Sequence, residues 1–433
     1  MKYNVKDVFG CSEQVPKNCP TFFERDVHKQ FKNALISKNI IVVYGESKQG
    51  KTWTIEKYCP NQCRIGCTND MKLLQLKISI LEKLGLPFET GHYERVTILE
   101  KEREGGISAS FQAVSLKQGR KKLNTTKETL TGDYQTINID DNNTYINTIK
   151  RIIRDRWIVL DNFHYLNPEI QRQFCSMLKE FNYHNIKIII LGVWKEASRI
   201  SALAPDLGNR CVHIDIGTWS NQELEQVCDQ GEKALNIKFS EEIIQFSVGI
   251  CVNNIGIFKD FLEQLCLHWD IHQTQKNIRI LNDLSAAQEI IQQYITNEFI
   301  NPLRDRLRNL AIPARVRKEA KHVRERIVLA LLQLIIDKDV SVIRNGILLS
   351  EVLAQIEKEH CYSSNVKLSR SNIVQELGLL HKRGETRGAI GNFIPLFYFD
   401  KSNNKVFILE PNLFVIKSIF PQEISGFIDY IKG

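Results

Sequence analysis

Short strand-like apolar runs alternate with segments of helical spacing through the first half of the chain. The helical segments cover residues 24–37, 70–84, 144–154 and 168–181, where apolar positions recur every three or four residues. Strands that alternate with amphipathic helices predict a parallel sheet with helices on both faces. The expected strands are 40–44, 63–67, 157–160, 186–191 and 212–216.

The second half has a different pattern. Residues 221–235, 240–248 and 253–268 read as helices without any strand pattern, as in a helical lid, and 271–320 reads as a helical connector. Three further helices, at 322–336, 348–357 and 369–382, precede two short strands, 397–399 and 406–408, that flank a polar turn. This order predicts a winged-helix domain. We expect the boundaries 1–217 for the core, 218–270 for the lid, 271–320 for the connector and 321–433 for the winged helix.

Residues 90–140 interrupt the core pattern. This stretch is polar, weakly periodic and basic around Arg120, Lys121 and Lys122, so we expect an insertion that forms a β-hairpin. Its basic tip is either a solvated loop, which is the simpler interpretation, or a contact for nucleic acid.

Bulk properties bound the class of protein. The 433 residues suggest about two to four domains. A net charge of +8 permits an acidic partner such as DNA without establishing one. We see no apolar run of spanning length, no signal-peptide core, and an odd number of 11 cysteines. These features predict a cytoplasmic protein with reduced thiols and no membrane partner.

The first expected strand leads into a phosphate-binding motif. The segment GESKQGKT matches G-x-x-x-x-G-K-[ST] between a strand and a helix, which is the context that a P-loop requires. Backbone N–H groups and the helix N-terminus favour bound phosphate. Lys51 should contact the β- and γ-phosphates, and Thr52 should ligate Mg²⁺. The expected nucleotide-binding residues are Gly45, Glu46, Ser47, Lys48, Gln49, Gly50, Lys51, Thr52 and Trp53.

A second motif follows the apolar strand WIVL. Four apolar residues that end in Asp161 form a Walker B strand, so Asp161 should act with Thr52 in holding Mg²⁺. The expected cofactors are therefore ATP or ADP with Mg²⁺.

These motifs resemble P-loop ATPases of the AAA+ and STAND groups, notably origin-recognition-like, transposition-regulator-like and archaeal-type members with a C-terminal winged helix. The resemblance rests on GESKQGKT, VLDNFHYL and LGNRCVHIDIGTWSNQELEQV. It implies an α/β fold, namely a P-loop αβα sandwich followed by the lid and winged helix. It also implies an arginine finger at Arg210, which precedes a short strand and the first lid helix.

Three departures from that family pattern concern turnover. Asn162 follows Asp161 where hydrolytic members usually place a glutamate. The strand 186–191 ends in Gly192 and Val193 rather than in a clear Asn or Thr. The lid segment NNIGIFKDF has Gly256 where an arginine is usual. These departures predict slow hydrolysis, with Asp161, Asn162 and Arg210 as the catalytic candidates, unless Glu46 or Glu169 supplies a base.

Two functions remain open from the sequence. The leading hypothesis is a nucleotide-controlled, self-associating switch that acts on a protein partner, as in STAND regulators, many of which serve in defence against mobile elements. The alternative is an AAA+ loader or transposition regulator that binds DNA through residues 369–387 and the 90–140 insertion. A winged helix suits DNA or protein equally well. A fast mechanical ATPase is disfavoured by Asn162.

Overall fold

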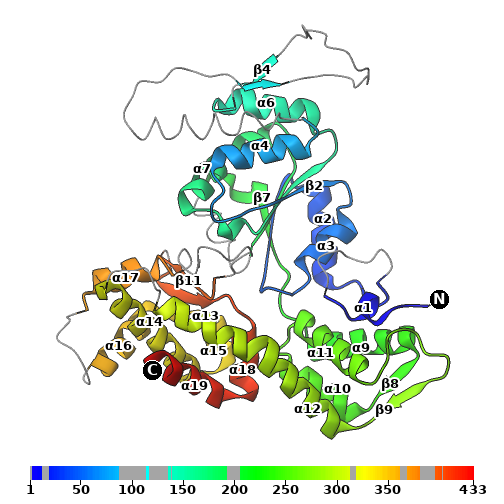
Figure 1. Ribbon diagram of the computed structural model, residues 1–433. Coiled ribbons are helices and arrows are strands. Elements are labelled where there is room, and N and C mark those ends of the chain that lie inside the picture. Colours follow the sequence, from blue (N-terminus) through cyan, green and yellow to red (C-terminus); the bar gives the residue numbers. More distant parts are fainter. Residues whose placement is uncertain are drawn as a thin grey trace, which may run out of the picture. The chain divides into compact units, whose positions relative to one another are not determined.

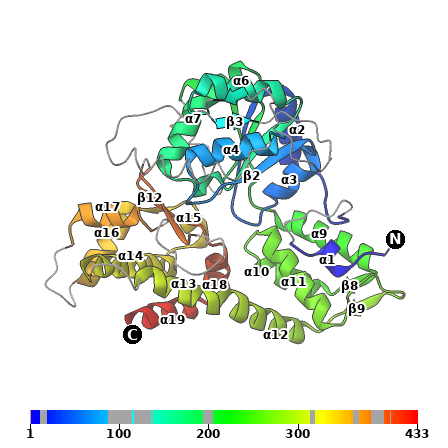
Figure 2. The ribbon, with the colours of Figure 1, turned by 45° about the horizontal axis from the view of Figure 1, so that its top comes forward.

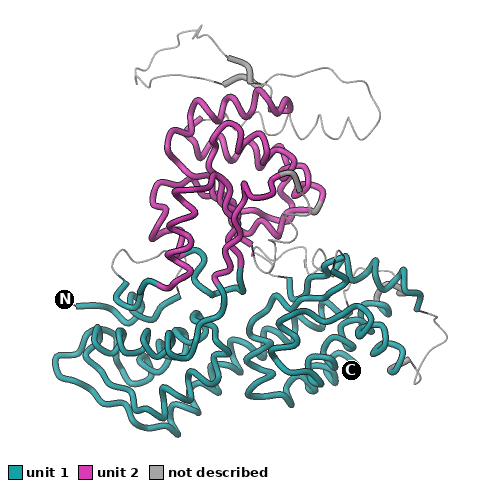
Figure 3. The backbone as a smooth tube through the Cα atoms, turned by 180° about the vertical axis from the view of Figure 1, so that it is seen from behind, with its two compact units in different colours: residues 1–24, 45–52, 217–433 teal, residues 25–44, 53–216 magenta. Residues whose placement is uncertain are grey.

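The computed structural model describes residues 2–11, 19–86, 114–116, 135–137, 139–192, 205–312, 318–360, 368–380, 395–401 and 403–433. The chain divides into two compact units (Figure 3). Unit 1 contains residues 1–24, 45–52 and 217–433, and unit 2 contains 25–44 and 53–216. The phosphate loop, 45–52, therefore groups with the C-terminal half of the chain, although it follows directly from a strand of unit 2.

Unit 2 is built on a five-stranded parallel sheet with the order β2-β5-β6-β1-β7. β6 lies between β1, which leads into the phosphate loop, and β5, which ends at Asp161. All five predicted strands are confirmed, with end shifts of at most two residues. They are β1 (Ile40–Tyr44), β2 (Gln62–Gly66), β5 (Trp157–Asp161), β6 (Ile188–Leu191) and β7 (Cys211–Asp215).

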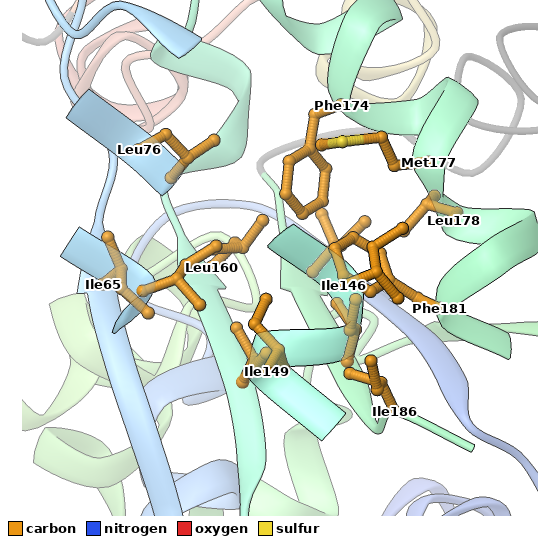
Figure 4. Close-up of a cluster of buried hydrophobic side chains, with 14 of the residues drawn as sticks. Ile65, Leu76, Ile146, Ile149, Leu160, Phe174, Met177, Leu178, Phe181 and Ile186 are labelled. Atoms are coloured by element: carbon orange, nitrogen blue, oxygen red, sulfur yellow. The ribbon is translucent and has the colours of Figure 1, made fainter. Parts of the chain in front are cut away.

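Helices cover both faces of this sheet because successive strand residues point to opposite sides. Ile158, Leu160 and their counterparts on β1 and β6 pack against α4, α6 and α7, and Figure 4 shows part of this core. Val159 and the alternate residues of the same strands pack with Phe31 of α2 and Ile55 of α3. The predicted αβα sandwich is therefore confirmed. The helices are α2 (Asp26–Ser37), α3 (Lys51–Tyr58), α4 (Leu73–Lys83), α6 (Asn142–Ile152) and α7 (Pro168–Tyr183).

Two short strands of the 90–140 segment are described. β3 (Val114–Leu116) pairs antiparallel with β4 (Gln135–Ile137), as the predicted hairpin requires (Figure 1). The basic residues 120–122 lie outside the described residues.

The lid of unit 1 contains the three predicted helices, α9 (Asn221–Leu235), α10 (Glu241–Ile250) and α11 (Ile255–His268). The expectation that this region has no strand is wrong. β8 (Ile237–Phe239) pairs in parallel with β9 (Arg279–Leu281). Three residues per strand are too few for a periodic signal, and the pairing joins segments about 40 residues apart, so local patterning could not reveal it.

The predicted helical connector, 271–320, is helical over residues 284–311, which form one continuous run (Figure 2), whereas its first part contains β9 and no helix. The run consists of α12 (Leu284–Tyr294), a π-helical segment (Ile295–Ile300) and α13 (Asn301–Ala311). Phe261 of α11 contacts both Tyr294 and Phe299, with ring centroids 6.1 and 6.3 Å away. This aromatic cluster fixes the lid to the π-helical segment.

The winged-helix domain is confirmed. β10 and β11 both pair antiparallel with β12. Ser369 caps α17 through its hydroxyl, as predicted, but the helix ends at Leu377 rather than Lys382, and residues 381–394 are outside the described residues. No described helix is long and apolar enough to cross a membrane. The elements are α14 (Lys318–Asp337), α15 (Val340–Arg344), β10 (Ile347–Leu348), α16 (Leu349–His360), α17 (Arg370–Leu377), β11 (Phe397–Asp400), β12 (Lys405–Ile408), α18 (Asn412–Ile419) and α19 (Pro421–Lys432).

Candidate nucleotide site

The phosphate loop turns through three residues with positive φ. Gly45 and Gly50 have φ of 145° and 92°, which explains why glycine is needed at both ends of the loop. Lys48 also has a positive φ, 63°, in the left-handed region that disfavours side chains. Something in the surrounding structure must therefore hold Lys48 in place.

Lys51 begins α3 and closes the loop. Its Nζ donates hydrogen bonds to the carbonyl oxygens of Gly45 and Glu46, at 2.8 and 2.7 Å. The ammonium group thus sits at the loop among oxygen acceptors, with the N-terminus of α3 beside it. This set of a cation, a glycine-bearing loop and a helix start fits a phosphate anion. The Thr52 hydroxyl, in the first turn of α3, is an oxygen donor suited to Mg²⁺.

The lid holds Lys48. Its Nζ is 2.9 Å from Asp260 Oδ2 on α11, and its carbonyl accepts from the Gly256 N–H at 3.0 Å. Burial opposes the charge on Lys48, but the Asp260 carboxylate outweighs it and raises the pKa of the lysine. These two bonds stabilise the left-handed backbone of Lys48.

Gly256 is required by this contact. A Cβ at Gly256 would lie 2.5 Å from the Cβ of Lys48 and 3.0 Å from its carbonyl oxygen. An arginine at this position, as in the family pattern, would collide with the loop. The departure seen in the sequence therefore has a structural cause, namely the close packing of α11 on the phosphate loop.

The remaining loop residues are also bonded within unit 1. Asn254 donates to the carbonyl of Ser47 at 3.0 Å, and the Gln49 side chain donates to the carbonyl of Asn253 at 3.2 Å. The Trp219 indole donates to the Gln49 carbonyl at 3.3 Å. The lid thus contacts the loop through both backbone and side-chain groups.

Asp161 lies in unit 2, at the end of β5. Its carboxylate pairs with Arg64 of the neighbouring strand β2, where Arg64 Nε is 2.9 Å from Asp161 Oδ2 and Nη2 donates to the same oxygen. Arg64 Nη1 is also 3.5 Å from Glu56 Oε1. Sequence reasoning missed Arg64, although an arginine within a partly apolar strand was a usable signal.

Asn162 has left-handed backbone angles, φ 57° and ψ 35°, and its N–H donates to Asp161 Oδ1 at 2.9 Å. Asparagine tolerates this region better than glutamate. The turn after β5 therefore supplies a physical reason for asparagine here. The Asn162 side chain can orient a water molecule through its amide oxygen but cannot take up a proton at neutral pH.

Both alternative bases are engaged. Glu46, only 7% exposed, forms an ion pair with Arg344 of the winged-helix domain, at 3.0 Å between Nε and Oε1. Glu169 lies at the start of α7, where it pairs with Arg172 and accepts from Gln173 at 2.9 Å.

Two other predicted residues have clear positions. Arg210 ends a 3-10 segment (Pro205–Arg210) directly before β7, and its side chain is exposed. The structure therefore leaves it accessible to another molecule. Trp53 lies in the first turn of α3, is partly exposed and belongs to unit 2.

No protein-family model matches the chain, and none of the curated proteins compared with it matches significantly. Solved structures do resemble it. The Orc1 protein of Aeropyrum pernix in complex with DNA has 10% identity and a TM-score of 0.42, with 98% of each chain covered. The Walker-type ATPase PABY2304 of Pyrococcus abyssi has 11% identity and a TM-score of 0.47, covering 92% of this chain and 96% of that one. AMPPCP-bound DnaA from Aquifex aeolicus has 12% identity and a TM-score of 0.35, covering 82% and 88%. The expected P-loop core rests on the chain's own structure, in which the glycine loop lies between β1 and α3 at the end of a parallel-sheet strand.

Proposed function

We propose that this chain is an ATP-binding regulatory ATPase that works as a nucleotide-controlled switch. One observation carries the proposal. The four variable residues of the phosphate loop, 46–49, are all bonded to the lid or to the winged-helix domain. A change in the conformation of the loop therefore changes its contacts with the lid and with the winged-helix domain.

The same contacts explain how a phosphate would act. The Lys51 ammonium now donates to the carbonyls of Gly45 and Glu46. A bound phosphate would attract this cation more strongly than neutral carbonyls do, because charge-assisted hydrogen bonds are stronger. The loop conformation, and with it the lid contacts, would then differ between ATP, ADP and nucleotide-free states.

Hydrolysis in this proposal is slow. General-base assistance is worth on the order of 10²–10⁴-fold in rate, and Asn162 cannot provide it. Glu46 and Glu169 are held in ion pairs. Thr52 and Asp161 would hold Mg²⁺, which neutralises phosphate charge when bound. A long-lived ATP state suits a switch that self-associates and engages a protein partner, as in STAND regulators and their roles in defence against mobile elements.

Calorimetry with ATP and ADP tests the binding step. Lys51→Ala should abolish binding, whereas Lys57→Ala, on the exposed side of the same helix, should bind like wild type. Hydrogen exchange of residues 253–262, with and without each nucleotide, tests the switch. Equal exchange rates in the ATP-bound, ADP-bound and nucleotide-free protein would show that nucleotide binding at the loop does not change the lid.

DNA binding is the second candidate function. The first turn of α17 exposes Arg370, Ser371 and Asn372, which are side chains able to contact phosphates or bases. Affinity that falls steeply with salt, and that is weakened by charge reversal at Lys382 and Arg383, would favour a DNA-bound loader. Absence of binding even at low salt would assign the winged helix to a protein partner.

A further inference from the structure

Arg344 connects three parts of unit 1. It is the last residue of α15 and lies between α14 and β10 of the winged-helix domain. Its Nε is 3.0 Å and its Nη2 is 3.5 Å from the two carboxylate oxygens of Glu46. Nη2 also donates to the carbonyl of Val252, in the turn between α10 and α11, and the guanidinium lies over the Phe414 ring, 5.2 Å from its centroid.

This ion pair is largely shielded from water. The side chains of Arg344 and Glu46 are 17% and 7% exposed. Removal of one partner from such a pair leaves an uncompensated charge in a poorly hydrated place. Phe414, Val252 and Glu46 together fix the guanidinium on three sides, so the position of Arg344 depends on α18, on the lid and on the phosphate loop.

The location of Glu46 gives the pair a consequence for nucleotide binding. Glu46 is the second residue of the phosphate loop and carries a negative charge where anionic phosphates are expected. An unpaired Glu46 carboxylate would repel them. With Arg344 in place, that charge is neutralised. ATP carries more phosphate charge than ADP, so loss of the Arg344 pairing should weaken ATP binding more than ADP binding.

We propose that Arg344 is a positioning residue by which the winged-helix domain controls the preference of the phosphate loop for ATP over ADP. The inference rests on the proposed function. When the winged-helix domain is seated on the loop, Arg344 screens Glu46 and the loop accepts the terminal phosphate. When the domain leaves, Glu46 is unscreened and ATP binding weakens. By linkage, ATP must in turn favour the seated domain.

Charge-removal variants test this pairing. Arg344→Ala should weaken binding of a non-hydrolysable ATP analogue by about tenfold or more, within the usual range of coupling between sites, and should weaken ADP binding less. Glu46→Gln in the Arg344→Ala background should restore affinity, because the repelling charge is gone. Arg344→Lys keeps the charge but not the two-nitrogen geometry, so its loss should be intermediate.

A matched control is available in the connector, where Arg304 of α13 pairs with Glu423 of α19. This pair is 3.4 Å apart on a more exposed surface, and Arg304→Ala should leave both affinities unchanged. Hydrogen exchange of residues 340–348 reports independently on contact between the winged-helix domain and the phosphate loop. This exchange should be faster in Arg344→Ala than in wild type when no nucleotide is present.

Three outcomes separate the possible failures. If Arg344→Ala folds and binds ATP and ADP with wild-type affinities, while Lys51→Ala binds neither, the role of Arg344 is overturned and the proposed function stands. If Glu46→Gln does not restore ATP affinity in the Arg344→Ala background, although Arg344→Lys folds and binds ATP, repulsion by Glu46 is overturned as the cause of the weaker binding. If wild type itself binds no nucleotide, the proposed function fails first.

Discussion

Arg64 on β2 holds the carboxylate of Asp161 at the end of the adjacent strand β5, with 2.9 Å between Nε and Oδ2. The parallel register places Arg64 opposite Val159 and Gly66 opposite Asp161, so the arginine side chain reaches two residues along the sheet to its partner. Arg64 would therefore compete with a bound Mg²⁺ for the carboxylate of Asp161, the expected metal ligand.

Arg64→Gln should lower the free energy of unfolding by about 1–3 kcal/mol, because a partly buried carboxylate loses a charged hydrogen-bond partner. The released carboxylate should also bind a divalent cation more strongly, so ATP binding should reach half-saturation at lower Mg²⁺. Denaturant unfolding and Mg²⁺ titration measure the two effects. The control is Arg172→Gln, which breaks an exposed pair and should change stability by less than about 0.5 kcal/mol. Unchanged Mg²⁺ dependence would argue against competition for Asp161.

Gly256→Ala should weaken nucleotide binding and destabilise unit 1. The added Cβ would meet Lys48 at 2.5 Å and force α11 away from the phosphate loop. Gly249→Ala is a matched control, since it lies in α10 and its Cβ would meet nothing within 4 Å. That control should stabilise the helix by roughly 0.5–1 kcal/mol and leave affinity unchanged. Equal behaviour of the two variants in calorimetry and thermal unfolding would contradict the close contact.

Asn162→Glu should accelerate single-turnover hydrolysis on the order of 10²-fold, because glutamate can accept the proton of the attacking water. Affinity should stay the same, since the phosphate loop and Asp161 are intact. The left-handed backbone at this position should cost the variant roughly 1–2 kcal/mol of stability. Asn162→Gly accepts the same backbone without a base and should be stable but slow. Fast hydrolysis by the wild type, with no gain in Asn162→Glu, would sink the slow-switch proposal.

Arg210→Ala should weaken nucleotide-dependent self-association if the arginine acts on a neighbouring subunit. The residue is exposed just before β7, so its loss should change the stability of the monomer little. Light scattering over a range of concentrations, with ATP and with ADP, measures the assembly. A wild type that stays monomeric with ATP at all concentrations removes this role.

Local patterning revealed most of the sheet and the loop, but not their long-range partners. The strands of unit 2 could be predicted because apolar runs such as 157–160 are buried on both faces. The loop could be predicted because its glycines have fixed spacing. Arg344 could not, since it is 298 residues from Glu46 and ion pairs between distant residues leave no local period. The short strands β8 and β9 were missed for the same reason. The helices α18 and α19 lie inside the expected winged-helix boundaries but follow the last predicted strand, 406–408, and were not predicted.

Two neighbouring residues of α11 contact different parts of unit 1. Asp260 bonds to Lys48 of the phosphate loop, and Phe261 packs on Tyr294 and Phe299 of the continuous helix that leads to the winged helix. That helix contains consecutive segments of 11, 6 and 11 residues, so its length is about 40 Å. It can act as a lever arm with its pivot at the aromatic cluster. The arm from the aromatic cluster to Ala311 is about 20 Å long, so a tilt of about 5° at the pivot would displace its far end by about 2 Å. A sub-ångström adjustment beside the phosphates would thereby become a larger displacement at the end of α13, which packs on α14 and α19 of the winged-helix domain.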